Sequence, residues 1–434
     1  MAYKFSPVAW SRNTSLYEVN LRQYTREGTF EAFSKHLPRL KDMGIGTLWF
    51  MPVTPISLVK RQGTLGSYYA CSDYVDTNPE FGTVDDFKRL VQKAHLVGFK
   101  VIIDWVANHT GYDHIWTKTN PEFYKKNAAG EFYDSNNWHD VIDLNYYDHA
   151  MRREMIKSMG FWVTECDIDG FRCDMAHLVP LDFWRDARTA LDAMKPLFWL
   201  AETEHINYQD VFDCSYAWHW MHETEKFAKN EIGVPELASV LRGYEAKTRP
   251  GTTYLFFTSN HDENSWNGTE YEKYGPAAKP FAVLSCTWNG IPLIYSGQEI
   301  PNMERLKFFD KDTIEWPEEI VLHDFYKTLL ELKKRSPALS AGDPTVTTDF
   351  LKTDHDQSVI AWRRKALENE VIVALNLSSH PLEVAITHQG ITGKYLNVLE
   401  GNTINFSEKA FMQIGPWGSV LLERSEPTAI NDKA

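Results

Sequence analysis

Short apolar runs alternate with amphipathic segments along most of the chain. Eight of the apolar runs have the length of β-strands, and several are apolar over four or five consecutive residues. Such continuity is typical of strands buried on both faces of a parallel sheet. These runs are 15–21, 45–53, 100–106, 169–175, 198–202, 212–218, 254–260 and 291–297. The segments between them carry apolar residues at helical spacing, so the pattern predicts strands that alternate with helices.

The segment 83–99 is the clearest predicted helix. Thr83 can cap its start, acidic residues occupy its first turn, and Gly98 can end it. Phe87 and Leu90 are among the apolar residues that fall on one face. Similar patterns occur in 29–44, where Pro38 must bend the helix, in 180–196 and in 322–337.

Eight strands, each followed by a helix, predict an α/β fold of the closed (β/α)8 TIM-barrel type, with an open doubly wound sheet as the alternative. The stretch 110–148 is polar, aromatic and rich in Asn, Asp and Gly, and it is too long for an ordinary loop. It predicts a small inserted subdomain after the third strand. The pattern changes after Pro337 to short alternating strands at 358–364, 371–377, 394–400 and 418–424, which predict an antiparallel β-sandwich. We expect a barrel domain over 1–340 that includes the insert, a β-sandwich over 341–426 and a polar tail over 427–434.

Composition excludes several classes of partner. The formal net charge of −14 disfavours nucleic acid and anionic lipid surfaces, and no run of about 20 apolar residues is present to span a membrane. The five cysteines are scattered and odd in number, so we expect buried free thiols and neither a disulfide framework nor a zinc site. The N-terminus shows no basic segment followed by an apolar one, which favours a cytoplasmic location unless a signal peptide was removed, in which case the protein is periplasmic or secreted. We also expect a monomer.

Charged residues gather where the predicted strands end. In a barrel of this type the carboxyl ends of all strands meet at one mouth. The residues at these ends are Asp104, Arg172, Asp174, Glu202, His261 and Asp262. One acid at a strand end is usually a cap or an ion-pair partner, but several acids after apolar runs are hard to attribute to folding, because buried carboxylates are costly. Two or three converging acids fit glycoside hydrolysis, in which one carboxylate attacks the anomeric carbon and a second carboxyl protonates the leaving oxygen.

Seven segments, in order, resemble the motifs of the α-amylase family of retaining glycoside hydrolases. They are GTLWFMPVTP (46–55), DWVANH (104–109), VIDLN (141–145), GFRCDMAH (170–177), LAETE (200–204), SNHDE (259–263) and GIPLIYSGQE (290–299). The resemblance implies that Asp174 is the nucleophile, Glu202 the general acid/base and Asp262 the acid that stabilises the transition state. Glu204 is the rival of Glu202, because strand alternation would point both the same way.

The resemblance also implies residues that bind the sugar or support the acids. Asp104 supports the site, Arg172 keeps Asp174 ionised, His109 and His261 bind the sugar at the cleaved position, and His177 reaches the leaving-group side. Tyr69 resembles the tyrosine that stacks on this sugar, with Tyr68 as the alternative, although Ala70 stands where the family often has an acid.

Calcium is the one cofactor that the resemblance raises. Family members often bind Ca²⁺ between barrel and insert, and Asn108 matches one of the ligands. The usual Lys-His pair near a second ligand is replaced here by His177-Leu178. The sequence therefore leaves calcium open, and no organic cofactor is expected.

The implied activity is double-displacement hydrolysis of α-1,4-glucosidic bonds in starch, glycogen or maltooligosaccharides. A glucanotransferase or an α-glucosidase on the same site is the alternative. A non-catalytic sugar-binding relative is disfavoured because all three acids are present. The sequence does not distinguish endo from exo cleavage.

Overall fold

The protein contains a closed barrel of eight parallel strands. The structure is a computed structural model that describes residues 5–386, 391–406 and 410–425. The strands are β1 (Leu16–Val19), β2 (Thr47–Phe50), β3 (Lys100–Trp105), β6 (Gly170–Cys173), β7 (Phe198–Ala201), β8 (Cys214–Tyr216), β9 (Thr253–Phe256) and β10 (Gly290–Tyr295). β1 pairs in parallel with both β2 and β10, which closes the sheet. The barrel predicted from the sequence is confirmed, and the open sheet is excluded.

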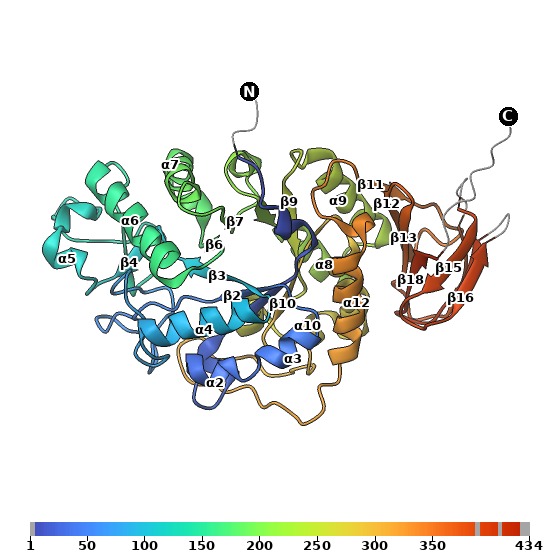
Figure 1. The fold of residues 1–434 in the computed structure, drawn as a ribbon, viewed down its shortest axis with the longest axis horizontal. Coiled ribbons are helices and arrows are strands. Elements are labelled where there is room, and N and C mark those ends of the chain that lie inside the picture. The colour runs from blue at the N-terminus through green and yellow to red at the C-terminus, as the bar shows by residue number, and fades with distance from the viewer. Residues whose placement is uncertain (1–4, 387–390, 407–409, 426–434) are drawn as a thin grey trace.

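Helices surround the barrel (Figure 1). They include α2 (Phe30–Ser34), α3 (Leu37–Asp42), α4 (Val84–Leu96), α6 (His149–Cys166), α7 (Leu181–Asp192), α8 (Trp218–Ala228), α9 (Val234–Lys247), α10 (Glu270–Tyr274), α11 (Ala278–Thr287) and α12 (His323–Arg335), and α1 (Leu21–Tyr24) follows β1 directly. One expected helix is missing: β7 is followed only by the 3-10 helix η4 (Ile206–Asp210). The connection from β7 to β8 covers residues 202–213, and η4 is its helical part.

Local sequence signals explain where two of these helices begin. The Thr83 side chain accepts a hydrogen bond from the Asp86 backbone N–H, and the Asp86 carboxylate accepts one from the Thr83 N–H, so a capping box starts α4. Pro38 does not bend a single helix over 29–44. It lies in the first turn of α3, where its missing N–H costs nothing, and the chain forms two short helices instead.

The insert after β3 lies at one end of the molecule's long axis, away from the C-terminal sheets (Figure 1). It contains β4 (His109–Gly111), α5 (Trp116–Thr119), the 3-10 helix η2 (Pro121–Phe123) and β5 (Val141–Asp143). β4 and β5 form an antiparallel pair in which His109 lies opposite Asp143. This pairing places the insert directly beside the end of β3.

The chain after α12 forms two antiparallel sheets. Six strands pair in the order β11 (Thr347–Phe350), β12 (Val359–Ala366), β13 (Asn369–Asn376), β18 (Ser419–Arg424), β15 (Gly393–Asn397) and β16 (Thr403–Phe406), and β14 (Leu382–Ile386) pairs with β17 (Ala410–Ile414). Val384 and Met412 of the smaller sheet join Ile372 and Leu422 of the larger one in a single apolar core. The sheets thus pack face to face, while the predicted tail 427–434 lies outside the described residues.

Buried aromatic rings join the barrel to these sheets. Trp288, after α11, packs edge to face against Trp362 of β12, with ring centroids 5.4 Å apart. The five cysteines are all buried and free, as expected. Within the described residues, no helix combines the length and apolar character needed to cross a membrane.

Candidate active site

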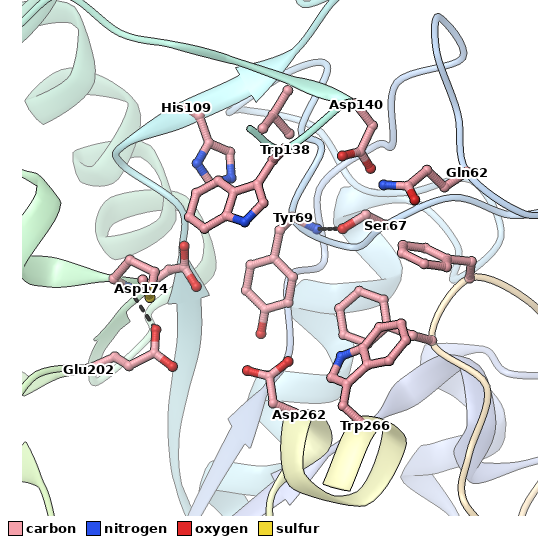
Figure 2. A pocket seen from close by; sticks show the side chains of 14 residues that line it. Gln62, Ser67, Tyr69, His109, Trp138, Asp140, Asp174, Glu202, Asp262 and Trp266 are labelled. Carbon is pink, nitrogen blue, oxygen red and sulfur yellow. Dashed lines mark hydrogen bonds between the residues drawn. The ribbon is translucent and has the colours of Figure 1, made fainter. Parts of the chain in front are cut away.

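The carboxyl ends of the barrel strands surround a cavity of about 330 Å³ (Figure 2). Three acids face it from three strand ends: Asp174 after β6, Glu202 after β7 and Asp262 after β9. The remaining lining residues are Gln62, Ser67, Tyr69, His109, Trp138, Asp140, Val141, Met175, Trp266, Phe308 and Phe309. The three acids that the sequence placed at strand ends are therefore brought together in one cavity.

The guanidinium of Arg172 contacts three acids of the site. Arg172 is fully buried, and its Nη1 lies 2.9 Å from an oxygen of Asp104 and 2.9 Å from an oxygen of Asp174. Its Nη2 lies 2.6 Å from Glu202 Oε1. Its Nε donates a hydrogen bond to the Tyr216 hydroxyl at 3.2 Å. Arg172 and Asp174 are two residues apart on β6, so strand alternation puts them on the same face.

Burial raises the pKa of both Asp174 and Glu202, although each lies beside this guanidinium. Burial raises the pKa of Asp174 to about 6, against the opposing charge of Arg172. Burial likewise raises the pKa of Glu202 to about 7. The charge of Arg172 lowers the pKa of Asp174, as predicted, but burial raises it by more. Both carboxyl groups therefore titrate much closer to neutral pH than free carboxyl groups do.

Directly after β6, the backbone at Met175 adopts a left-handed conformation and contacts Glu202. Met175 has φ 38° and ψ 47°, a left-handed geometry that is costly for a residue with a side chain. Its N–H donates to Glu202 Oε2 at 2.7 Å. This bond fixes the Glu202 carboxyl beside Asp174.

Glu202 and Glu204 point to different places. β7 ends at Ala201, so the alternation assumed from the sequence does not reach Glu204. The Glu204 carboxylate accepts a hydrogen bond from the Tyr244 hydroxyl and lines a separate surface cavity beside α8 and α9. Only Glu202 faces the cavity that holds the other two acids.

Tyr69, not Tyr68, lines the cavity. Its hydroxyl donates to Asp104 Oδ2 at 3.1 Å and lies 2.7 Å from His261 Nε2. The Tyr68 hydroxyl instead donates to Asn20 Oδ1, away from the cavity.

His261 lies behind Tyr69 and does not line the cavity. The two rings stack with centroids 5.4 Å apart. His261 Nδ1 lies 2.5 Å from Glu18 of β1. Burial opposes a charge on the imidazole, but the carboxylates of Asp262 and Glu18 outweigh it and raise the pKa of His261 to about 9. A charged His261 can thus hold Tyr69 in place.

The two remaining predicted histidines differ in their relation to the cavity. His109 lines the cavity, and its ring packs edge to face on Trp138 of the insert, 5.1 Å between centroids. Burial lowers the pKa of His109 to about 4, so it is neutral at physiological pH. His177 is half-buried outside the lining and interacts with the backbone of Glu202, and its ring lies 5.3 Å from His205.

Comparison with known proteins gives the family. The sequence model of the α-amylase catalytic domain matches residues 12–140 and 120–366, which is most of the chain. The chain belongs to the α-amylase family of glycoside hydrolases. It is 26% identical over 397 residues to alpha-amylase MalA of Haloarcula japonica, covering 87% of this chain but only 57% of that protein. It is 24% identical over 491 residues to alpha-amylase 3 of Dictyoglomus thermophilum, covering 95% and 94%.

A solved structure extends the likeness to almost the whole chain. The maltogenic alpha-amylase AmyB of Thermotoga neapolitana superposes with a TM-score of 0.88 at 29% identity, covering 96% of this chain and 99% of that one. The C-terminal sheets are therefore shared with this relative, as well as the barrel.

Several residues at this α-amylase-type site were not found from the sequence. Glu18 is a charged residue within an apolar strand, which is a signal that could have marked it. Trp138 and Asp140 of the insert and Phe308 come from loops, where no periodic pattern points to a cavity, and Trp266 lies in the short π-helix η5 (Glu263–Asn267) just after Asp262.

Asn108 and Asp143, the oxygen-bearing residues beside the insert, already contact other protein groups. Asn108 directs its amide Nδ2 at His109 Nδ1, 3.2 Å away. Asp143, opposite His109 in the β4–β5 pair, has one oxygen 2.8 Å from the Lys125 ammonium, while its other oxygen is buried without a hydrogen bond. Ca²⁺ takes about six to eight oxygen ligands. Among the described residues, no group of three or more acidic, His or Cys side chains is placed to hold a metal ion.

Proposed function

We propose that the protein is a retaining hydrolase of α-1,4-glucosidic bonds in α-glucans and maltooligosaccharides. The observation that carries the proposal is the placement of Asp174 and Glu202 around one buried guanidinium, with pKa values near 6 and 7. This arrangement places two carboxyl groups, both with pKa values raised toward neutral pH, in one cavity, where one can act as a carboxylate and the other as an acid. These are the two groups that double displacement requires.

In the first step an Asp174 oxygen attacks the anomeric carbon, while the bond from that carbon to the leaving sugar breaks. Glu202 gives its proton to the leaving oxygen, so a glycosyl ester of Asp174 and a free sugar hydroxyl form. In the second step Glu202 takes a proton from water, whose oxygen attacks the same carbon and releases Asp174. Two inversions leave the anomeric configuration unchanged.

The surrounding residues prepare the substrate for this chemistry. Tyr69 offers an aromatic face to the sugar at the cleaved position, and its hydroxyl is held by Asp104 and His261. Asp262 faces the cavity and can accept hydrogen bonds from sugar hydroxyls as positive charge develops at the anomeric carbon. Neutral His109 can donate to a sugar hydroxyl.

The pH dependence of kcat/KM should be bell-shaped. The first step needs Asp174 ionised, so the rate should rise with pH through about 6, and it needs Glu202 protonated, so the rate should fall above about 7. The maximum should therefore lie between these values. Initial rates on a maltooligosaccharide across pH 4 to 10 would measure it, and a plateau that extends above pH 9 would contradict the proposed roles.

Removal of divalent cations should leave the enzyme active and stable. Lys125 already supplies the positive charge beside Asp143, so we propose that calcium is not required. Activity and melting temperature should be the same before and after dialysis against EDTA. A melting temperature lowered by more than about 5 °C, and restored by Ca²⁺ but not by Mg²⁺, would contradict this proposal.

One incubation tests the proposed activity. Soluble starch and maltooligosaccharides should yield new reducing ends, and proton NMR should find the α-anomer first. Longer oligosaccharides formed from maltotriose alone would favour the glucanotransferase alternative. No release from any α-glucan by the folded protein would overturn the proposal. The monomeric state and the cytoplasmic location stay predictions from the sequence.

A further inference from the structure

The cavity has two distinguishable ends if the proposed function holds. Glu202 protonates the leaving oxygen, so the departing sugar lies on the side of Glu202, where His177 also lies. The glucosyl unit that is transferred to Asp174, with anything attached to its non-reducing side, must extend the other way, past Tyr69. Figure 2 shows Gln62, Ser67 and Trp266 on that side of Tyr69, opposite Glu202. We call this the far end, formed by these three residues with Phe308 and Phe309.

Two loops are bonded to each other behind the far end. One follows β2 and the other follows β10. The Leu65 backbone N–H donates to the Phe309 carbonyl at 2.9 Å. The Asp310 carboxylate accepts from the backbone N–H of Thr64 at 2.8 Å and from its hydroxyl at 2.6 Å. A sugar chain cannot pass between backbones that are hydrogen-bonded to each other.

Two further features hold these loops together. Buried Arg22 donates from Nη1 to the carbonyl of Gly66 at 3.0 Å and to that of Phe308 at 3.4 Å, so one guanidinium binds both loops. Gly63 has φ 59°, and a Cβ there would lie 2.5 Å from the Cβ of Phe309. Only glycine allows so close an approach with this backbone geometry. Residues of both loops thus contribute to the contact that closes the far end.

A carboxylate that lines the cavity has one oxygen that is buried without a hydrogen-bond partner. Asp140 of the insert is 5% exposed and lines the cavity, and its Oδ2 receives no hydrogen bond. An ionised carboxylate can only accept hydrogen bonds, and leaving such an atom buried and unpaired is costly. A sugar hydroxyl is a donor of the right kind. Figure 2 shows Asp140 above Gln62 on the far-end side of Tyr69.

We propose that this cavity is a chain-end pocket, which takes the non-reducing end of an α-glucan against the bonded loops and has Asp140 accept a hydrogen bond from a hydroxyl of the bound end. The enzyme then releases short products from chain ends and leaves internal bonds uncut. This inference rests on the proposed function and adds to it the position of cleavage.

Two forms of one substrate test the position of cleavage. Nitrophenyl maltoheptaoside would be supplied with a free non-reducing end and with that end blocked by an ethylidene acetal, and loss of substrate would be followed by chromatography. The free form should be consumed at least roughly a hundredfold faster, because the acetal meets the bonded loops. Similar rates would overturn the chain-end pocket and leave the proposed function standing. If neither form, nor any other α-glucan, is cut, the proposed function and this inference both fall.

A matched pair of variants tests the closure. Asp310→Ala removes both hydrogen bonds to Thr64, whereas Asp310→Asn keeps an oxygen that can accept them. In Asp310→Ala, the rate on the blocked substrate relative to the rate on the free one should increase roughly tenfold. In Asp310→Asn, this ratio of rates should stay near that of the parent. An unchanged ratio in Asp310→Ala would overturn the assignment of the closure to this bridge.

A second pair tests Asp140. Asp140→Ala should raise KM for free maltooligosaccharides by roughly tenfold or more with a smaller change in kcat, since a hydrogen bond to the bound end is lost. Glu122→Ala, at an exposed acid elsewhere on the insert, is the control and should match the parent. An unchanged KM in a folded Asp140→Ala would overturn the role of Asp140.

Discussion

Asp174→Asn should abolish turnover and leave the protein folded. An amide cannot form the glycosyl ester through which double displacement passes, so kcat on maltooligosaccharides should fall by roughly four orders of magnitude or more. The fold should survive because Arg172 keeps its contacts with Asp104 and Glu202. Rates by reducing-end assay, with circular dichroism and a melting curve on the same sample, give both results.

The outcome separates a nucleophile from a supporting acid. An Asp174→Asn variant with activity within about tenfold of the parent would overturn the assignment of Asp174. If the variant loses both its activity and its melting transition, the substitution has unfolded the protein and the loss of activity does not test the nucleophile. In that case, trapping of a covalent adduct on Asp174 of the parent by a fluorinated maltosyl substrate, located by mass spectrometry, decides the point. An adduct on another residue would contradict the assignment.

Glu202→Gln should be slow on ordinary glucans and recover on activated ones. The variant lacks the proton for the leaving oxygen, so the rate on maltooligosaccharides should fall by roughly 10² to 10⁴-fold. A maltosyl fluoride needs no such proton, so the first step on that substrate should be partly restored. The descending limb of the pH profile on the fluoride should also disappear, because that limb reports loss of the Glu202 proton.

Glu204→Gln is the matched control. Glu204 is two residues from Glu202, yet its carboxylate binds the Tyr244 hydroxyl and lines a different cavity. It should therefore keep the parent's rate and pH profile. If Glu204→Gln shows rescue by the fluoride and Glu202→Gln does not, the general acid has been assigned to the wrong residue.

The sequence by itself determined the barrel and the strand ends that carry its acids. Apolar runs such as 100–106 are buried on both faces and are recognisable without tertiary information. Asp104 and Asp174 lie at or just after such runs, and parallel strands bring their carboxyl ends to one mouth. The cap at Thr83 is likewise a local signal that the structure confirms.

Only the tertiary structure decided which neighbouring side chain faces the cavity and what charge it carries. Glu202 and Glu204 are equivalent by spacing, and they differ because β7 ends at Ala201. The raised pKa of Asp174 depends on how far burial outweighs Arg172, which is a balance of distances across three strands. The far end is assembled from loops 246 residues apart, joined where Asp310 meets Thr64. Contacts between loops follow no sequence periodicity, so the pattern of residues along the chain does not predict them.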